Sequence, residues 1–129
     1  MRIVGVLLTA SLMLGIGVSW ASLDHRGAGA PTVEVVVFEH PDSISCRQFR
    51  NDVLPKYDQA MRTAAPLRFV DVAIDGTASL GLNKPIEVVP TVAVMRDGRE
   101  IDRIVGYWGS TNFFVLLSHI LARMGDPPG

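Results

Sequence analysis

The chain has 129 residues and one cysteine, and 12 basic side chains nearly balance 13 acidic ones. That length suits one domain, and the near-neutral charge argues against a nucleic-acid-binding protein, which needs a basic surface to neutralise phosphates. The single cysteine, Cys46, excludes an internal disulfide and a zinc site built from several cysteines. The three histidines show no ligand spacing, and no glycine-rich phosphate loop follows a strand, so neither a metal nor a cofactor is expected.

The N-terminal segment, residues 1–21, has the layout of a secretory signal peptide. Arg2 precedes an uncharged apolar stretch, and the small residues Ser19 and Ala21 suit a cleavage site. The stretch is just long enough to span a bilayer, so an uncleaved membrane anchor is the alternative. Both interpretations predict an exported domain that lies outside the cytoplasm. The rest of the chain divides into a linker over 22–31, a domain over 32–125 and a tail over 126–129.

The first half of the domain predicts a strand followed by a helix. Residues 33–38 (VEVVVF) are β-branched and almost continuously apolar, which is typical of a strand covered on both faces. Residues 43–62 carry apolar side chains at the three- to four-residue spacing of one helix face. Ser43, or Asp42 before it, suits the N-cap of this helix. Pro55 is expected to kink or break the helix, because proline lacks an N–H and clashes with the preceding turn.

The second half predicts three more strands and a closing helix. The connection after the second strand contains glycine, asparagine and proline, so we expect at most one short helical turn there, around 78–82. Asp97-Gly98 is typical of a tight hairpin turn. Strands are predicted over 67–74, 91–95 and 100–107, and the helix from Ser110 to Gly125.

This order of elements predicts an α/β fold, strand–helix–strand followed by strand–strand–helix. The first crossover requires a parallel pair of strands, and the hairpin requires an antiparallel pair. Together they predict a four-stranded mixed sheet. Helices on both faces are the expected way to cover such a sheet in a chain of this length.

The same order, with Cys46 opening the first helix, resembles the thioredoxin superfamily. Val89-Pro90-Thr91 directly precedes the third strand, where that family keeps a cis-proline facing the active site, and Gly106 ends the fourth strand, where the family has a glycine. Over residues 38–121 the chain also looks like the periplasmic SoxS-type thioredoxin-like proteins encoded with sulfur-oxidation genes. That narrower resemblance rests on Cys46 and Pro55 at the same offset, Ala65-Pro66-Leu67-Arg68, Pro90-Thr91-Val92, Gly106-Tyr107 and Phe113-Phe114.

The tetrad Ser43-Ile44-Ser45-Cys46 departs from the Cys-x-x-Cys motif of this family at its first position. In the dithiol, the helix N-terminus activates the first thiol and the second thiol resolves the mixed disulfide. A hydroxyl cannot form a disulfide, so only the resolving position remains and one chain cannot complete the dithiol cycle. The sequence therefore leaves open whether the protein is an enzyme, that is, a degenerate thiol–disulfide oxidoreductase.

The groups around the tetrad also differ from the family pattern. The resemblance implies a buried carboxylate on the first strand beneath the site, but Val37 occupies the matching position. Glu39 and His40 lie closer to the strand end. Asp42 replaces the usual aromatic residue before the tetrad, and an acid there disfavours a thiolate by like-charge repulsion.

Each candidate site residue has two interpretations. Cys46 is either a monothiol that forms mixed disulfides or a small buried hydrophobe. Ser43 is either a hydrogen-bond donor to a bound partner or a helix cap. Val89 and Pro90 form either a rigid turn or, as the resemblance implies, a binding edge that pairs with a substrate peptide.

Two functions follow from these interpretations. The first is a periplasmic redox accessory protein whose Cys46 exchanges with the thiol or disulfide of a partner protein, or with glutathione. The SoxS-type resemblance implies a role in keeping the cysteine of a sulfur-oxidation carrier protein reduced. The second is a redox-inactive module that binds a partner protein in the groove around Val89 and Pro90.

Overall fold

The computed structural model describes residues 30–61, 65–77 and 80–125, so the predicted signal segment, most of the linker and the tail lie outside the described residues. Within the described part, no helix is both long and apolar enough to cross a bilayer. The elements are β1 (Val33–Glu39), α1 (Ile44–Ala60), β2 (Leu67–Asp71), β3 (Thr91–Arg96), β4 (Arg99–Val105) and α2 (Ser110–Gly125).

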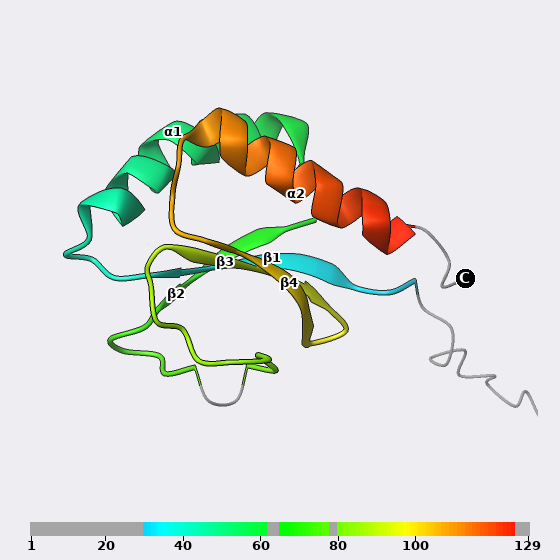
Figure 1. Ribbon diagram of the computed structural model, residues 1–129, viewed down its shortest axis with the longest axis horizontal. Coiled ribbons are helices and arrows are strands. Elements are labelled where there is room, and N and C mark those ends of the chain that lie inside the picture. Colours follow the sequence, from blue (N-terminus) through cyan, green and yellow to red (C-terminus); the bar gives the residue numbers. More distant parts are fainter. Residues whose placement is uncertain (1–29, 62–64, 78–79, 126–129) are drawn as a thin grey trace, which may run out of the picture.

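The strands form one four-stranded sheet in the order β2-β1-β3-β4 (Figure 1). β1 pairs in parallel with β2, which α1 connects to it, and antiparallel with β3. β3 and β4 form the antiparallel hairpin around Asp97 and Gly98, both of which have positive φ. The predicted α/β class and mixed sheet are confirmed.

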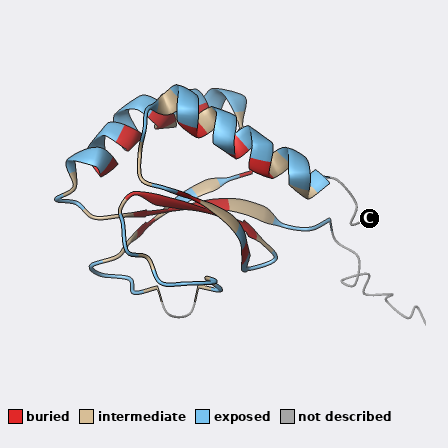
Figure 2. Ribbon diagram, viewed as in Figure 1, coloured by how far each residue is buried: buried red, intermediate tan, exposed pale blue. Residues whose placement is uncertain are grey.

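Both described helices pack on the same face of the sheet (Figure 1). Their buried side, visible as red bands in Figure 2, meets the side chains of Val35 and Val37 from β1 and of Val92 and Val94 from β3. The prediction of helices on both faces was wrong for the described residues.

The opposite face is covered by the connection between β2 and β3 instead. Val36 and Phe38 of β1 pack there against apolar residues of the connection: Val72, Leu80, Leu82 and Ile86. Gly76 and Gly81 have positive φ, which interrupts helical backbone, and no helix forms in the described parts of this connection.

Several predicted elements changed, and β4 ends at Val105 instead of residue 107. α1 runs without a break from Ile44 to Ala60, with Pro55 inside it at an exposed position. β2 ends at Asp71 rather than at residue 74. The Asp71 carboxylate accepts a hydrogen bond from the Ala73 N–H, and the Asp75 carboxylate accepts one from the Asp71 N–H, so a turn replaces the strand end.

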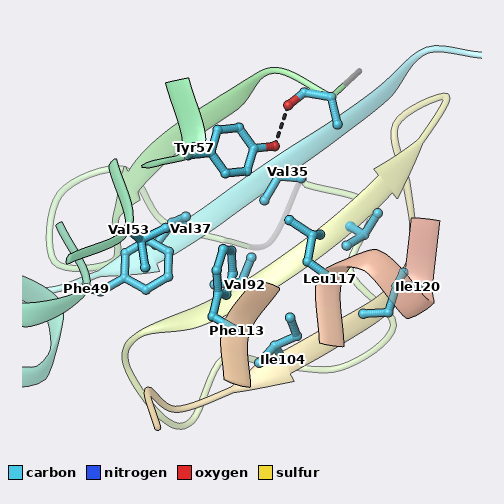
Figure 3. Close-up of a cluster of buried hydrophobic side chains, with 12 residues drawn as sticks. Val35, Val37, Phe49, Val53, Tyr57, Val92, Ile104, Phe113, Leu117 and Ile120 are labelled. Atoms are coloured by element: carbon cyan, nitrogen blue, oxygen red, sulfur yellow. Dashed lines mark hydrogen bonds between the residues drawn. The ribbon is translucent and has the colours of Figure 1, made fainter. Parts of the chain in front are cut away.

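The main core lies between the helices and the sheet, and aromatic rings form its centre (Figure 3). Phe49 of α1 makes an edge-to-face contact with Phe113 of α2 at a centroid distance of 5.0 Å. The buried hydroxyl of Tyr57 donates a hydrogen bond to the carbonyl of Ala65, just before β2. These contacts fix α1, and with it the tetrad at its N-terminus, against the sheet.

Candidate functional site

The tetrad and the Val89–Pro90 segment lie at the same end of the sheet. Phe38 of β1 pairs with Thr91 of β3, so Pro90 lies just beyond the pair at the end of β1 that leads into α1. The Gly106 N–H at the end of β4 donates a 2.8 Å hydrogen bond to the Pro90 carbonyl. Three strand ends therefore converge on the start of α1 (Figure 1).

Ser43 is the N-cap of α1. Its hydroxyl oxygen accepts a hydrogen bond from the Cys46 N–H at 3.2 Å, and its backbone is extended. This satisfies one of the donors that a helix start leaves without an intrahelical partner. The structure thus shows the capping role of Ser43, while its role toward a partner stays a prediction.

Cys46 lies in the first turn of α1 and faces inward. Its exposed fraction is 3%, whereas the neighbouring Ile44 is 66% exposed. The inward position follows from the helical period, since Cys46 shares its face with the buried residues Phe49 and Val53. Ile44 and Ser45 of the tetrad are therefore exposed to a reagent in solution, whereas the Cys46 sulfur is covered.

Arg50 places a guanidinium one helical turn after Cys46. Its Nε donates a 2.8 Å hydrogen bond to the Glu39 carboxylate, a second bond joins the same pair, and the guanidinium carbon lies 3.7 Å from the centroid of the Phe69 ring. The hydrogen bond to Glu39 raises the pKa of Arg50 above its ordinary value, and the charge of the Glu39 carboxylate adds to this rise. Bidentate pairing and ring stacking hold this cation between the end of β1 and the first turns of α1.

No motif marks Arg50 in the sequence, although its i,i+4 spacing from Cys46 puts both side chains on one helix face. Val37 is fully buried in the apolar core on the helix side, as its sequence neighbours suggest. Glu39 lies two residues later on the same face of β1, and its side chain is 15% exposed. Its carboxylate is therefore the closest in chain position to the buried carboxylate that the family resemblance implies at Val37.

His40 and Asp42 lie at the surface of the loop that leads into α1. The Asp42 N–H donates a 3.1 Å hydrogen bond to Nδ1 of His40, which accepts it in the neutral form of the ring. The Asp42 side chain is 91% exposed, so solvent screens its charge. These contacts stabilise the loop.

The Val89–Pro90 peptide bond is cis, and Pro90 is buried while Val89 is half-buried. The Thr91 hydroxyl donates a 2.6 Å hydrogen bond to the Val88 carbonyl. Together with the bond from Gly106 to the Pro90 carbonyl, this holds both sides of Val89. The segment Val88–Pro90 is called the cis-proline edge below.

Large apolar side chains are exposed around this end of the sheet. They stand at the start of α1, after β2, at the cis-proline edge and after β4, and we call them the apolar rim: Ile44, Ile74, Val88 and Trp108. Exposed large apolar side chains on segments that meet at one end of a sheet are candidates for contact with another protein.

Tyr107 connects the segment that follows β4 to α1. Its hydroxyl donates a 2.8 Å hydrogen bond to the Asp52 carboxylate, and its ring packs edge-to-face on Phe49 at 5.6 Å. Burial, with help from the Asp52 carboxylate, raises the pKa of Tyr107 to about 12. Burial also raises the pKa of Tyr57 to about 12.

Tyr57 and Tyr107 are the only tyrosines of the chain, so the ionisation of tyrosine can be read directly from ultraviolet absorbance. We expect the folded protein to titrate near pH 12 and the protein unfolded in urea near pH 10. Because folding raises both pKa values, the stability contributed by the neutral phenols is complete below about pH 10 and is lost as the pH rises through about 12. A folded-state midpoint near 10 would contradict the burial of the Tyr57 hydroxyl and the hydrogen bond from Tyr107 to Asp52.

The comparisons with known proteins agree with this architecture. A family model described as a thioredoxin-like domain matches residues 24–121. No curated protein matches the chain. The structure of reduced periplasmic thioredoxin SoxS from Paracoccus pantotrophus superimposes with a TM-score of 0.66 at 24% identity, over 71% of this chain and 98% of that one. Thioredoxin from Fasciola hepatica superimposes with a TM-score of 0.56 at 22% identity, over 68% of this chain and 80% of that one.

These structural likenesses show the fold, and the family match covers most of the chain from the linker to α2. The predicted membership of the thioredoxin superfamily and the resemblance to SoxS are confirmed. The chain therefore belongs to the family of thioredoxin-like domains.

Proposed function

We propose that this chain is an exported thioredoxin-like protein that binds an extended segment of a partner protein along the cis-proline edge and presents it to Cys46 for thiol–disulfide exchange. The position of Cys46 in the first turn of α1, at the end of the sheet where that edge lies, carries the proposal. Val89 and Pro90 form the binding residues, and the apolar rim supplies the surrounding contact area.

Export is supported by the signal-like segment 1–21 and by the similarity to a periplasmic thioredoxin. In that compartment the partner is a protein with a reactive cysteine, or glutathione. The likeness to SoxS favours a partner from sulfur oxidation.

The exchange step consumes one disulfide and makes another. The Cys46 thiolate attacks one sulfur of the partner disulfide, the bond between the two partner sulfurs breaks, and the second sulfur leaves as a thiolate. Since Ser43 offers no second thiol, the mixed disulfide persists until an external thiol, such as reduced glutathione, resolves it.

A second candidate function, binding without sulfur chemistry, is favoured by one observation. Cys46 is only 3% exposed, and reactivity requires access to the sulfur. The exchange mechanism therefore requires the first turn of α1 to open, and opening near a helix end has a low free-energy cost compared with global unfolding.

The test is the intact mass of the folded protein after incubation with glutathione disulfide. We expect one glutathione adduct, absent from the Cys46→Ala variant and removed by reduced glutathione. The protein unfolded in urea is the positive control for thiol chemistry. An adduct on the unfolded but not on the folded protein would overturn the exchange mechanism and leave the binding function.

A further inference from the structure

A β-bulge in β4 brings two charged side chains to the same face of the sheet. Residues three apart in a strand normally point to opposite faces. Here Glu100 pairs with Met95 and Arg103 pairs with Ala93, with a register shift that leaves Ile101 as the extra residue. Since Met95 and Ala93 face away from the helices, both Glu100 and Arg103 do so too.

The two side chains form a buried ion pair beneath the connection between β2 and β3. The side chain of Glu100 is 3% exposed and that of Arg103 is 9% exposed. Arg103 donates through Nε and Nη2 to the two carboxylate oxygens of Glu100, at 2.7 and 2.6 Å. A bidentate pair of this kind has a defined geometry, so the guanidinium is held in one orientation.

The pair also holds the backbone of the connection. Arg103 donates to the carbonyl of Lys84 at 2.8 Å and to that of Pro85 at 3.2 Å. The Glu100 carboxylate accepts from the Asn83 N–H at 3.4 Å, and the Asn83 side-chain amide donates to the Glu100 carbonyl at 3.2 Å. We call Glu100 and Arg103 with these contacts the arginine clamp.

The arginine clamp and Gly106 hold the two ends of the segment that contains the cis-proline edge. One end is fixed at the Lys84 and Pro85 carbonyls, and the other at the Pro90 carbonyl by the Gly106 N–H. Both anchors belong to the β4 side of the sheet. In the described residues this face has no helix to support the segment, so side-chain hydrogen bonds to its carbonyls take that role.

We propose that Arg103, oriented by Glu100, is a positioning residue that sets the place of the cis-proline edge and so its ability to bind a partner segment. The binding part of this proposal rests on the proposed function, whereas the positioning part rests on the clamp contacts alone. Arg103 acts through the backbone of residues 84–90 and not on the partner itself.

The test compares Arg103→Lys with a matched control, Arg68→Lys. Lysine keeps the charge but has one nitrogen, which cannot hold the carboxylate and two carbonyls together. Arg68 forms the same bidentate type of pair, with Glu34 at 3.0 and 3.2 Å, but this pair joins β2 to β1, and both of its hydrogen bonds go to Glu34 instead of to carbonyls of the connection. Glu100→Gln is the second clamp variant and takes the place of Arg103→Lys if that protein does not fold.

The first readout is amide hydrogen exchange of Gly106 by nuclear magnetic resonance, because this N–H bonds to Pro90 and does not contact Arg103. We expect exchange at Gly106 to become about tenfold faster in the clamp variant and to stay unchanged in Arg68→Lys. Amides in α1 serve as internal reference. Unchanged exchange at Gly106 in the clamp variant would overturn the positioning role, whether or not the protein binds a partner.

The second readout is the rate at which Cys46 exchanges with two disulfides. One is a short synthetic peptide whose central cysteine is joined to thiopyridine, and the other is dithiodipyridine, which has no peptide backbone. Cys46 attacks a sulfur of each probe and releases thiopyridine. We expect the clamp variant to lose about tenfold in rate with the peptide and none with the small probe.

An equal loss with both probes, or none with the peptide, would overturn the binding part of the proposal. A wild-type protein that reacts with neither probe would instead refute the exchange chemistry of the proposed function. Amide hydrogen exchange at Gly106 then still tests the positioning role of Arg103. Failure of this role and failure of the proposed function are therefore distinguishable.

Discussion

Ser43→Cys is expected to give the chain an internal disulfide and a complete dithiol cycle. Ser43 caps α1 and Cys46 lies three residues later in its first turn, where the Ser43 hydroxyl oxygen lies 3.2 Å from the Cys46 backbone nitrogen. A thiol at the helix start is stabilised as its thiolate by the helix dipole and by free N–H groups. It is also less buried than Cys46, so it can attack a partner disulfide while Cys46 resolves the product.

Two measurements check this prediction. After mild oxidation, the intact mass should fall by two hydrogen atoms and maleimide should no longer label the protein. Reduction of insulin by dithiothreitol should become faster than with the wild type by roughly an order of magnitude. Ser45→Cys is the matched control, because it adds a thiol to the same turn next to Cys46 but outside the Cys-x-x-Cys spacing. Two free thiols in oxidised Ser43→Cys would contradict the geometry assigned to this turn.

Phe49→Ala is expected to lower the free energy of unfolding by about 3–5 kcal/mol, because it removes a fully buried aromatic side chain. The Phe49 ring is 1% exposed and makes edge-to-face contacts with three other rings, at centroid distances between 5.0 and 6.4 Å: Phe69, Tyr107 and Phe113. It thereby connects α1 to β2, to the segment after β4 and to α2. No other aromatic residue in the described core makes ring contacts to as many elements.

Denaturant unfolding monitored by circular dichroism measures this loss as a lower midpoint at constant slope. Ile44→Ala is the control, since Ile44 is a large apolar residue of the same helix that is 66% exposed. We expect it to change the stability by less than about 0.5 kcal/mol. A loss below about 1 kcal/mol for Phe49→Ala would show that the ring does not support the core in the way described here.

Local patterns in the sequence predicted the elements because local physics decides them. The run of β-branched residues in β1, the Asp97-Gly98 turn and the hydroxyl of Ser43 before α1 act within a few residues of chain. The end of β2 was predicted less well. Its apolar alternation continues past Asp71, but the side chains of Asp71 and Asp75 hydrogen-bond to the backbone and form a turn.

The charged contacts of the site could not be predicted in the same way. Arg50 meets Glu39 across a loop, and Arg103 of β4 meets the carbonyls of Lys84 and Pro85 in the connection that covers the same face of the sheet. Backbone carbonyls have no sequence signature, and a carboxylate can pair with any arginine that the fold brings near. The bulge at Ile101 makes the Glu100–Arg103 pair still harder to predict. In a regular strand these two residues, three apart, would point to opposite faces of the sheet, whereas the bulge puts both on the same face.

By itself, the sequence determined the α/β class, the order of the strands and helices along the chain, the capped start of α1 and the single sulfur at the fourth position of Ser43-Ile44-Ser45-Cys46. The tertiary structure alone decided that both described helices share one face, that Arg50 pairs with Glu39, and that the buried Glu100–Arg103 pair holds the carbonyls of Lys84 and Pro85. The reason is physical. Hydrophobic period and capping act between neighbours in the chain, whereas burial and ion pairing depend on residues that only the folded sheet brings together.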